Sequence, residues 1–231
     1  MWEWNDSEKA LYFMGEKATP EIRTLEQMRP VLYDPEATGP EEVYYMYRSI
    51  NLPEHTELME QHKVRYDITV IPAAKYGPEF VKTKGHYHAL QGEQTYPEIY
   101  EVIEGEAHYL FQNKNEVVVY KATEGDKVIV PPDFGHVTIN SSDKTLVMSN
   151  FVSPEFSSDY GPFMEKQGAA YYKLDTGWVE NPRYEGVSMT LAEPGEKNCP
   201  FHTKNKTMYE MFCEKPELFY FVNNPGFCPK R

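Results

Sequence analysis

The sequence is poor in cysteine. Only Cys199, Cys213 and Cys228 occur in 231 residues, and all three lie within the last 33 residues. An odd number of cysteines in a chain of this length does not resemble the disulfide framework of a small secreted domain. We therefore predict free thiols and a cytoplasmic location. The alternative is a structural Cys₃His zinc site that adds His202.

Basic side chains and long apolar runs are also scarce. The chain has 23 lysines and arginines against 36 acidic residues, which gives a net charge of -13. Because nucleic-acid binding needs a basic surface, we expect no nucleic-acid partner. No run approaches the roughly 18 apolar residues of a membrane span. The first six residues, MWEWND, do not resemble a signal peptide, and we expect no membrane association.

Aromatic residues, by contrast, are abundant, with 18 tyrosines, 12 phenylalanines and 3 tryptophans. Such residues favour strands. Short strand-like runs recur through the middle of the chain, and Gly, Asn, Asp or Pro separates most of them. The expected strands are 43–48, 64–71, 80–84, 99–103, 107–112, 116–121, 127–130, 136–140 and 145–151, followed by a hairpin of 171–174 and 178–180. This pattern predicts an all-β sandwich or jelly-roll barrel.

The chain divides into three predicted parts. Residues 1–42 form an N-terminal extension, 43–184 the barrel with its flanking hairpin, and 185–231 a C-terminal extension that contains the cysteines. We expect residues 1–20 to be irregular. Thr24 and Gln27 fit a capping box that starts one short helix, which ends at Pro30.

Two histidines are spaced for a metal site. His86 and His88 flank Tyr87, and on a strand this spacing places both imidazoles on one side. For the pair alone, a solvated strand face is an equally good interpretation. With one carboxylate and a third histidine, the pair would form a His₃Glu site. That ligand set suits Fe²⁺, Mn²⁺, Ni²⁺, Co²⁺ or Zn²⁺ and does not choose among them.

The surroundings of this pair resemble the two motifs of the cupin superfamily. In the first motif, His-x-His is followed by a glutamate with six residues between it and a glycine, as in Glu98 to Gly105. The second motif runs from Gly125 through Pro131, Gly135 and His136 to Asn140. The resemblance implies a cupin double-stranded β-helix. It also implies that His86, His88, Glu98 and His136 bind the metal.

Other candidates compete for these positions. Glu93 lies at the commoner cupin distance from His88, but it sits in a polar run, whereas Glu98 begins an apolar strand. His108 lacks the preceding Pro-and-Gly turn of His136, so we expect it to pack in or line the barrel. His55 and His62 lie in a charged stretch and are expected to be solvated.

A narrower resemblance begins at the residues Thr83-Lys84-Gly85-His86-Tyr87-His88. They are similar to the metal motif of the cupin-type glucose-6-phosphate isomerases, and the similarity extends over roughly residues 20 to 184. It includes Val43-Tyr44, Thr69-Val70, Glu98-Ile99-Tyr100, Val130-Pro131-Pro132, Asp159-Tyr160-Gly161 and Asn181-Pro182-Arg183. The resemblance implies a metal-dependent enzyme that interconverts glucose 6-phosphate and fructose 6-phosphate, with Fe²⁺ as the expected ion. It also implies a homodimer.

Residue roles follow from the same resemblance. Glu98 is the base that moves a proton through an enediol(ate), and Tyr100 lies beside the sugar; a metal-assisted hydride shift is the rival mechanism. The expected substrate-binding residues are Tyr44, Thr69, Thr83, Gly85 and Tyr160, with Lys82 and Lys84 adding positive potential. We expect Gly85 to kink the strand, since a regular strand would point Thr83 away from His86.

The chain departs from archaeal members of the family at two positions. Ser158 stands where they carry a histidine, and Val152 where they carry a tyrosine. Because ring opening of the closed sugar needs an acid or base, these changes leave the residue that opens the ring unassigned. A cupin oxygenase and a non-catalytic sugar-binding cupin are therefore alternative functions.

Overall fold

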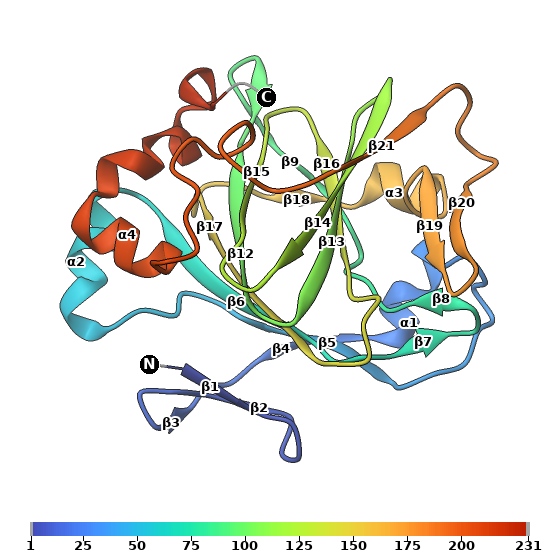
Figure 1. Ribbon diagram of the computed structural model, residues 1–231, viewed down its shortest axis with the longest axis horizontal. Helices are drawn as coiled ribbons and strands as arrows, with labels where there is room; N and C mark the ends of the chain where they lie inside the picture. The colour runs from blue at the N-terminus through green and yellow to red at the C-terminus, as the bar shows by residue number, and fades with distance from the viewer. Residues whose placement is uncertain (1, 230–231) are drawn as a thin grey trace.

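The computed structural model describes residues 2–229, and two facing β-sheets form its centre (Figure 1). The six-stranded sheet has the order β15 (Lys127–Val130), β12 (Glu98–Glu104), β17 (Leu146–Val152), β6 (Arg65–Ile71), β5 (Glu42–Tyr47) and β4 (Glu21–Thr24). The four-stranded sheet has the order β16 (Gly135–Ile139), β13 (Glu106–Gln112), β14 (Glu116–Thr123) and β21 (Ser188–Ala192). Side chains of both sheets fill the space between them, which confirms the all-β cupin barrel.

Strands of the six-stranded sheet are buried on both faces because each face has its own core. On β6, Tyr66, Ile68 and Val70 point outward, while Asp67, Thr69 and Ile71 point into the barrel. This alternation follows from the two-residue period of a strand. The inward face of β6 is therefore partly polar.

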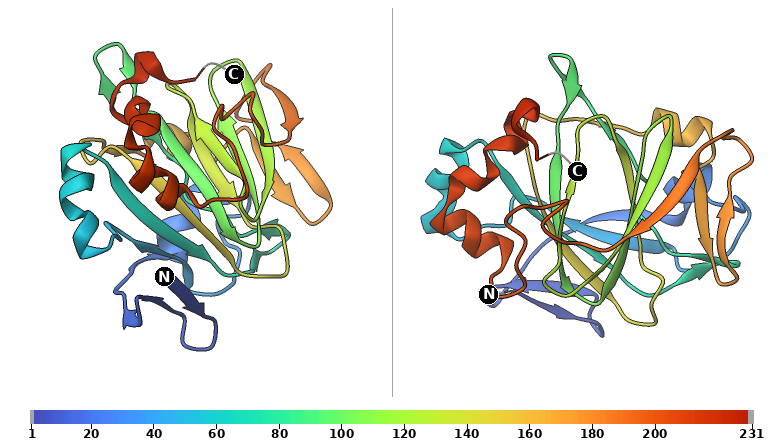
Figure 2. Two further views of the ribbon diagram at one scale, coloured as in Figure 1. Left: turned by 60° about the vertical axis from the view of Figure 1, so that its left-hand side comes forward. Right: turned by 45° about the horizontal axis from the view of Figure 1, so that its top comes forward.

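The C-terminal extension covers the outward face of this sheet. Helix α4 (Met208–Glu214) and the 3₁₀ helix η3 (Pro216–Asn223) lie beside α2 (Thr56–Gln61) at the outside of the barrel (Figures 1 and 2). The rings of Phe212 and Phe219 lie 4.8 and 5.0 Å from that of Phe151 on β17. The extension thus completes a second core.

Buried polar groups tie the extension to the barrel. Lys127 is fully buried and donates to Glu101 Oε1 and to the carbonyl of Thr203, both at 2.8 Å. Glu101 in turn accepts from the amide of Met208 at 2.7 Å. The side-chain amide of Asn198 accepts a hydrogen bond from the backbone N–H of Ile129 and donates one to its carbonyl. Since each charge is paired and hydrogen-bonded, the cost of its burial is offset.

Within residues 2–229, four smaller sheets lie outside the two main ones, and one of them is formed by the N-terminal strands. A four-stranded one has the order β20 (Gly177–Glu180), β19 (Tyr171–Leu174), β8 (Glu79–Phe80) and β7 (Lys75–Tyr76), which confirms the predicted last hairpin. Two pairs join β10 (Leu90–Gln91) to β11 (Gln94–Thr95) and β9 (Tyr87–His88) to β18 (Ser158–Asp159). The predicted strand at 80–84 was wrong beyond Phe80. The chain leaves regular strand geometry there and turns at Gly85, whose φ is +75°.

The prediction of an irregular segment at residues 1–20 was also wrong, because residues 2–17 form a three-stranded sheet of β1 (Trp2–Asn5), β2 (Ala10–Phe13) and β3 (Glu16–Lys17), while Met1 lies outside the described residues. Positive φ angles at Lys9 and Gly15 allow its tight turns. Leu11 is fully buried, and the ring of Trp4 lies 5.5 Å from that of Tyr45. The alternation of apolar and polar residues in these strands is too short to identify from the sequence. Packing against the outer face of β5 stabilises the sheet.

Short helices connect the strands. The capping-box prediction is confirmed, since α1 (Leu25–Met28) follows Thr24, whose amide donates to Gln27. The remaining helices are η1 (Arg29–Val31), η2 (Pro53–His55), α3 (Gly161–Glu165) and η4 (Pro225–Phe227). Within the described residues, no helix has the length and apolar character needed to cross a membrane.

The second core predicts a sharp difference between two neighbouring residues of η3. Phe219 is 1% exposed and Tyr220 is 55% exposed. Phe219→Ala should lower the free energy of unfolding by about 3–5 kcal/mol, because it leaves a cavity beside Phe151. Tyr220→Ala should lower it by less than about 1 kcal/mol. Urea denaturation of both variants checks this, and equal losses would mean that the extension does not pack as described.

Candidate metal centre and active site

Four predicted ligands meet at one point inside the barrel. Ligand atoms of His86, His88, Glu98 and His136 all lie within 4.8 Å of one another. Nε2 of His88 is 3.2 Å from Nε2 of His86 and 3.2 Å from Oε2 of Glu98. Nε2 of His136 is 3.3 Å from the same carboxylate oxygen. The structure therefore brings together the whole predicted ligand set.

Different elements supply these four residues. His88 lies on β9, Glu98 begins β12, and His136 lies on β16, where it forms an isolated bridge with His86. A glycine before two of the histidines allows close packing. A Cβ atom on Gly85 would lie 2.6 Å from Val137, and one on Gly135 would lie 2.4 Å from the ring of Tyr87. The cupin glycines thus permit the close approach of the two histidine segments.

The donor set fits a divalent cation. His88 Nδ1 lies 2.8 Å from the carbonyl of Tyr96, an arrangement that places the proton on Nδ1 and leaves Nε2 as an acceptor toward the cluster. Neither ring nitrogen of the buried His136 meets hydrogen-bond geometry, although its Nε2 faces Oε2 of Glu98 at 3.3 Å. A cation between these two atoms would satisfy both of them.

Electrostatics also favours a cation here. Burial, together with the neighbouring His136 and His88, holds the pKa of His86 well below its usual value. Burial raises the pKa of Glu98, but the adjacent imidazoles of His136 and His88 outweigh it, so its pKa lies well below the usual range. A neutral imidazole at His86 and an ionised carboxylate at Glu98 are protonation states that metal binding requires.

Tyr100 lies next to this cluster, as the resemblance implies. Its hydroxyl donates to Glu98 Oε2 at 3.1 Å, and its ring stacks on Tyr109 with centroids 5.1 Å apart. Burial and then the charge of Glu98 raise the pKa of Tyr100 well above its usual value. The phenol is therefore a fixed hydrogen-bond donor beside the carboxylate.

The predicted tyrosines gather on the other side of His86, around an arginine. The hydroxyl of Tyr44 accepts from Arg23 Nε and from the amide of Lys84, both at 3.2 Å. Arg23 Nη2 donates to Tyr160 at 3.4 Å, and the ring of Tyr160 lies 5.7 Å from that of His86. Arg23 was not predicted as a site residue. Its place in the site follows from its pairing with Tyr44 between β4 and β5.

The threonines and Lys82 have different positions. Thr69 points into the barrel from β6, and Thr83 Oγ1 accepts from the amide of Thr138 at 2.9 Å. Lys82 is buried and bonded to Glu79 and to the carbonyl of Val31. Its expected contribution to the site was therefore wrong. Lys84 keeps that role, since its ammonium lies 5.2 Å from the centre of the Tyr160 ring.

The competing ligands lie outside the cluster. Glu93 is exposed. His108 contacts Ser141 at 3.0 Å and packs edge-on against Trp178, and burial lowers its pKa to about 4. The exclusion of both residues agrees with the sequence analysis.

The prediction that His55 and His62 are solvated was wrong. The extension partly covers both, with His55 3.0 Å from the Tyr209 hydroxyl and His62 edge-on to Phe212. The Cys₃His alternative is absent from residues 2–229, because His202 binds Asp126 instead and no cysteine joins a group of three metal-binding side chains. All three thiols are free.

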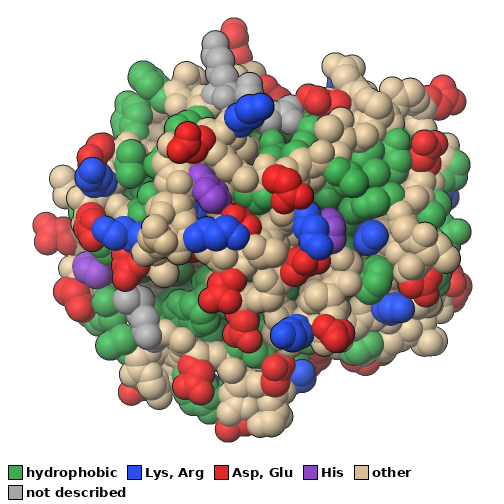
Figure 3. All heavy atoms as spheres, viewed as in Figure 1, with side chains coloured by type: hydrophobic (Ala, Val, Ile, Leu, Met, Phe, Trp, Pro, Cys, Tyr) green, Lys and Arg blue, Asp and Glu red, His purple; other side chains and the backbone are tan. Residues whose placement is uncertain are grey.

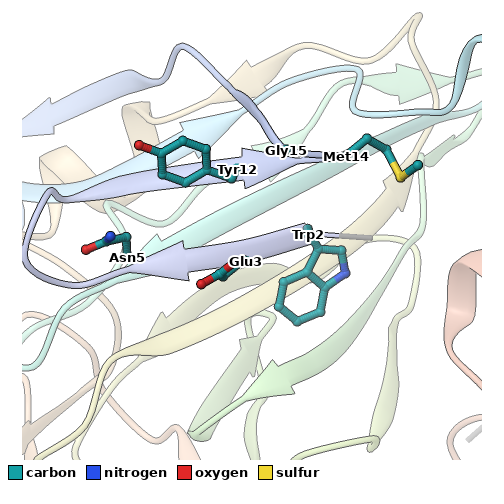
Figure 4. A pocket seen from close by; sticks show the side chains of 6 residues that line it. All are labelled: Trp2, Glu3, Asn5, Tyr12, Met14 and Gly15. Atoms are coloured by element: carbon teal, nitrogen blue, oxygen red, sulfur yellow. The ribbon is translucent and has the colours of Figure 1, made fainter.

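The outer surface differs from the barrel interior. On the face shown in Figure 3, acidic and basic side chains are interspersed without a continuous basic surface. A hollow of about 490 Å³ lies on the N-terminal sheet, where Figure 4 shows Trp2 and Glu3 on β1 and Tyr12 on β2. This hollow has no histidine in its lining, and it is separate from the metal centre.

Comparison with known proteins agrees with this geometry. A family model described as glucose-6-phosphate isomerase (GPI) matches residues 22–189. This chain belongs to the glucose-6-phosphate isomerase family. The matched segment contains every predicted ligand and substrate-binding residue, while the C-terminal extension beyond Met189 lies outside it.

Two archaeal relatives of the family show the extent of the similarity. The glucose-6-phosphate isomerase of Thermococcus litoralis is 29% identical over 73% of this chain and 90% of its own length. That of Thermococcus gammatolerans is 30% identical over 71% and 86%. Among solved structures, hazelnut vicilin has a TM-score of 0.42 at 13% identity and covers 62% of this chain and 34% of its own. A cupin-like protein from Thermotoga maritima has a TM-score of 0.32 at 16% identity, with 54% and 74% covered.

Gly85 gives a test of how the site is built. Gly85→Ala should lower the free energy of unfolding by about 2–5 kcal/mol, from the positive φ and from the contact with Val137. Gly92 also has a positive φ (+65°) but has no atom within 4 Å of an added Cβ. Gly92→Ala should therefore cost only about 1–2 kcal/mol. Thermal unfolding with metal titration measures both, and metal affinity should fall only in the Gly85 variant. Matching effects of the two variants would contradict a packing role for Gly85.

Proposed function

We propose that this chain is a metal-dependent isomerase that interconverts glucose 6-phosphate and fructose 6-phosphate by proton transfer through an enediol(ate). The convergence of Glu98 with three imidazoles beside Tyr100 is the observation that carries the proposal. Membership of the glucose-6-phosphate isomerase family and the names of the curated relatives support the substrate.

The metal would be held by His86, His88, Glu98 and His136. A divalent ion there supplies stabilisation of the negative charge that develops on the substrate oxygens. Three nitrogen ligands and one oxygen ligand suit Fe²⁺, the proposed ion, and also Mn²⁺, Ni²⁺, Co²⁺ or Zn²⁺.

Glu98 is the proposed base. Isomerisation removes a proton from the carbon next to a carbonyl and returns one to the neighbouring carbon, and a positioned base contributes roughly 10²–10⁴-fold to such a step. The contacts of Glu98 with His88, His136 and Tyr100 all involve Oε2, so Oε1 is the oxygen proposed to accept the proton. Tyr100 fixes the orientation of the carboxylate through its hydrogen bond.

The phosphate would bind on the side of His86 where the tyrosines gather. Tyr44 and Tyr160 offer hydroxyls there, and Arg23 and Lys84 add charge. The backbone of Gly85 and the hydroxyls of Thr69 and Thr83 are the remaining proposed contacts. Guanidinium and backbone N–H groups are effective phosphate donors. A local cationic group of this kind lets a chain of net charge -13 accept an anionic substrate.

Ser158 favours a second candidate, a sugar-binding cupin without turnover. This residue pairs with His88 at the site, where archaeal relatives carry a histidine. A serine hydroxyl is a poor acid or base near neutral pH, so the two candidates differ in whether ring opening is catalysed. The homodimer and the cytoplasmic location stay predictions.

The experiment is metal removal and replacement. The protein is stripped with a chelator, single divalent metals are restored, and conversion of fructose 6-phosphate is followed with a coupled glucose-6-phosphate dehydrogenase. Activity should vanish on stripping and return with Fe²⁺. Glu98→Gln should lower kcat by at least 100-fold because the base is lost, and His136→Ala should also lose bound metal.

His108→Gln serves as the matched control, because this histidine lies outside the cluster. It should retain activity within about threefold, since this partly buried residue packs against Trp178 away from the ligand cluster and glutamine keeps a polar group for Ser141. A folded, metal-loaded protein that binds the sugar phosphate but does not convert it would replace the isomerase with the sugar-binding function.

A further inference from the structure

A second cationic group, which the sequence analysis did not identify, lies inside the barrel. Arg48 Nη1 donates to Asp67 Oδ2 at 2.9 Å. Arg65 donates to the same carboxylate through Nε at 3.0 Å and through Nη2 at 2.8 Å. The amide of Ser49 adds a fourth donor, at 2.9 Å. Asp67 is fully buried, so it holds both guanidinium groups in fixed positions.

Strand register places this group beside the metal centre. Asp67 on β6 pairs with Asn150 on β17, and Asn150 pairs with Tyr100 on β12. These three residues therefore form one row across the sheet. The ring of Phe156 links the two groups, because it lies 5.5 Å from the Arg65 guanidinium and 4.5 Å from the imidazole of His88.

The two arginines of this group are more exposed than the carboxylate that holds them. Both guanidinium groups bind Asp67, and Arg48 Nε also lies 3.8 Å from the exposed carboxylate of Glu21. The side chains of Arg48 and Arg65 are 39% and 24% exposed, whereas Asp67 is 0% exposed. The bonds of Arg65 to Asp67 use Nε and Nη2, which leaves the N–H groups of Nη1 directed elsewhere. A guanidinium fixed in this way is suited to bind an anionic oxygen.

The two cationic groups lie at different ends of the barrel face. Tyr44, which contacts Arg23 and Lys84, lies on β5. Arg48 comes four residues later, directly after the end of this strand. At about 3.3 Å per residue, this separation is roughly 13 Å. Burial lowers the pKa of Arg48, but the carboxylates of Asp67, then Glu21 and then Glu98 raise it above its usual value, so Arg48 lies near enough to Glu98 to interact with its charge. A phosphate at the first group leaves the second for the reacting end of the sugar.

We infer that Arg48 and Arg65, held by Asp67, form an anion-binding subsite for the C1–C2 oxygens of the sugar phosphate. This inference rests on the proposed function. It assigns the orientation of the substrate, with the phosphate at Arg23 and Lys84 and the C1–C2 end at Arg48 and Arg65. The subsite binds negative charge on those oxygens more strongly than neutral hydroxyls. The ligand class that fits best is a phosphorylated aldonic acid, which carries a phosphate at one end and a carboxylate at C1.

The test compares two ligands that differ only at C1. Calorimetric titration of the metal-loaded full chain uses 6-phosphogluconate, with a C1 carboxylate, and sorbitol 6-phosphate, with a neutral C1 hydroxymethyl group. In Arg48→Gln and Arg65→Gln, affinity for 6-phosphogluconate should fall about tenfold or more, as for loss of a charged hydrogen bond. Affinity for sorbitol 6-phosphate should change by less than about threefold.

Controls separate this effect from misfolding. Removing one arginine leaves the buried Asp67 short of a partner, so the double variant Arg65→Gln/Asp67→Asn restores the balance and should show the same selective loss. Arg29→Gln, which breaks an ion pair with Glu26 and a hydrogen bond to the Pro35 carbonyl outside the barrel interior, should change neither affinity. Bound metal is measured for each variant.

The outcomes distinguish the hypotheses. Unchanged affinity for both ligands in a folded Arg65→Gln protein would overturn the subsite, while isomerase activity of the unmutated protein would still support the proposed function. Equal losses for both ligands would instead place the phosphate at Arg48 and Arg65, and would also overturn the inferred orientation. An unmutated protein that binds neither ligand and converts no sugar phosphate would contradict the function and the subsite together.

Discussion

A buried carboxylate surrounded by three imidazoles is the constraint on which the rest of the barrel depends. Glu98 is 3% exposed, and an ionised group at that depth is costly unless it is paired. Its partners His88 and His136 come from different strands, so the facing sheets must keep a fixed separation to hold them. Gly85 and Gly135 permit the close approach of the segments that carry His86 and His136, because a Cβ atom at either position would collide with the other segment.

The charge distribution of the molecule follows from the same constraint. A chain of net charge -13 disfavours anions at its surface, yet it places Arg23, Lys84, Arg48 and Arg65 around the barrel interior. Because charges beyond about 10 Å are largely screened at physiological ionic strength, these nearby cations determine what the site attracts. An acidic exterior with a locally cationic interior admits an anionic sugar without a basic outer surface.

The sequence predicted the parts of the site that are local in the chain. The resemblance to the cupin motifs selected His86, His88, Glu98 and His136, which the structure brings together, and alternation located most strands of both sheets. It did not reveal the group around Asp67, because that group depends on the register of strands that are distant in sequence. The N-terminal sheet was missed for a related reason, since packing against β5 stabilises it and its own pattern is weak.

X-ray absorption spectroscopy at the edge of the bound metal tests the central claim most directly. The protein is purified with its own metal, and the spectrum reports the type and number of the ligand atoms. We expect a first shell of three imidazole nitrogens with oxygen from Glu98 and from water or substrate. A shell that contains sulfur would contradict the account, because it would place the metal at Cys199, Cys213 or Cys228 in the C-terminal extension and not in the barrel.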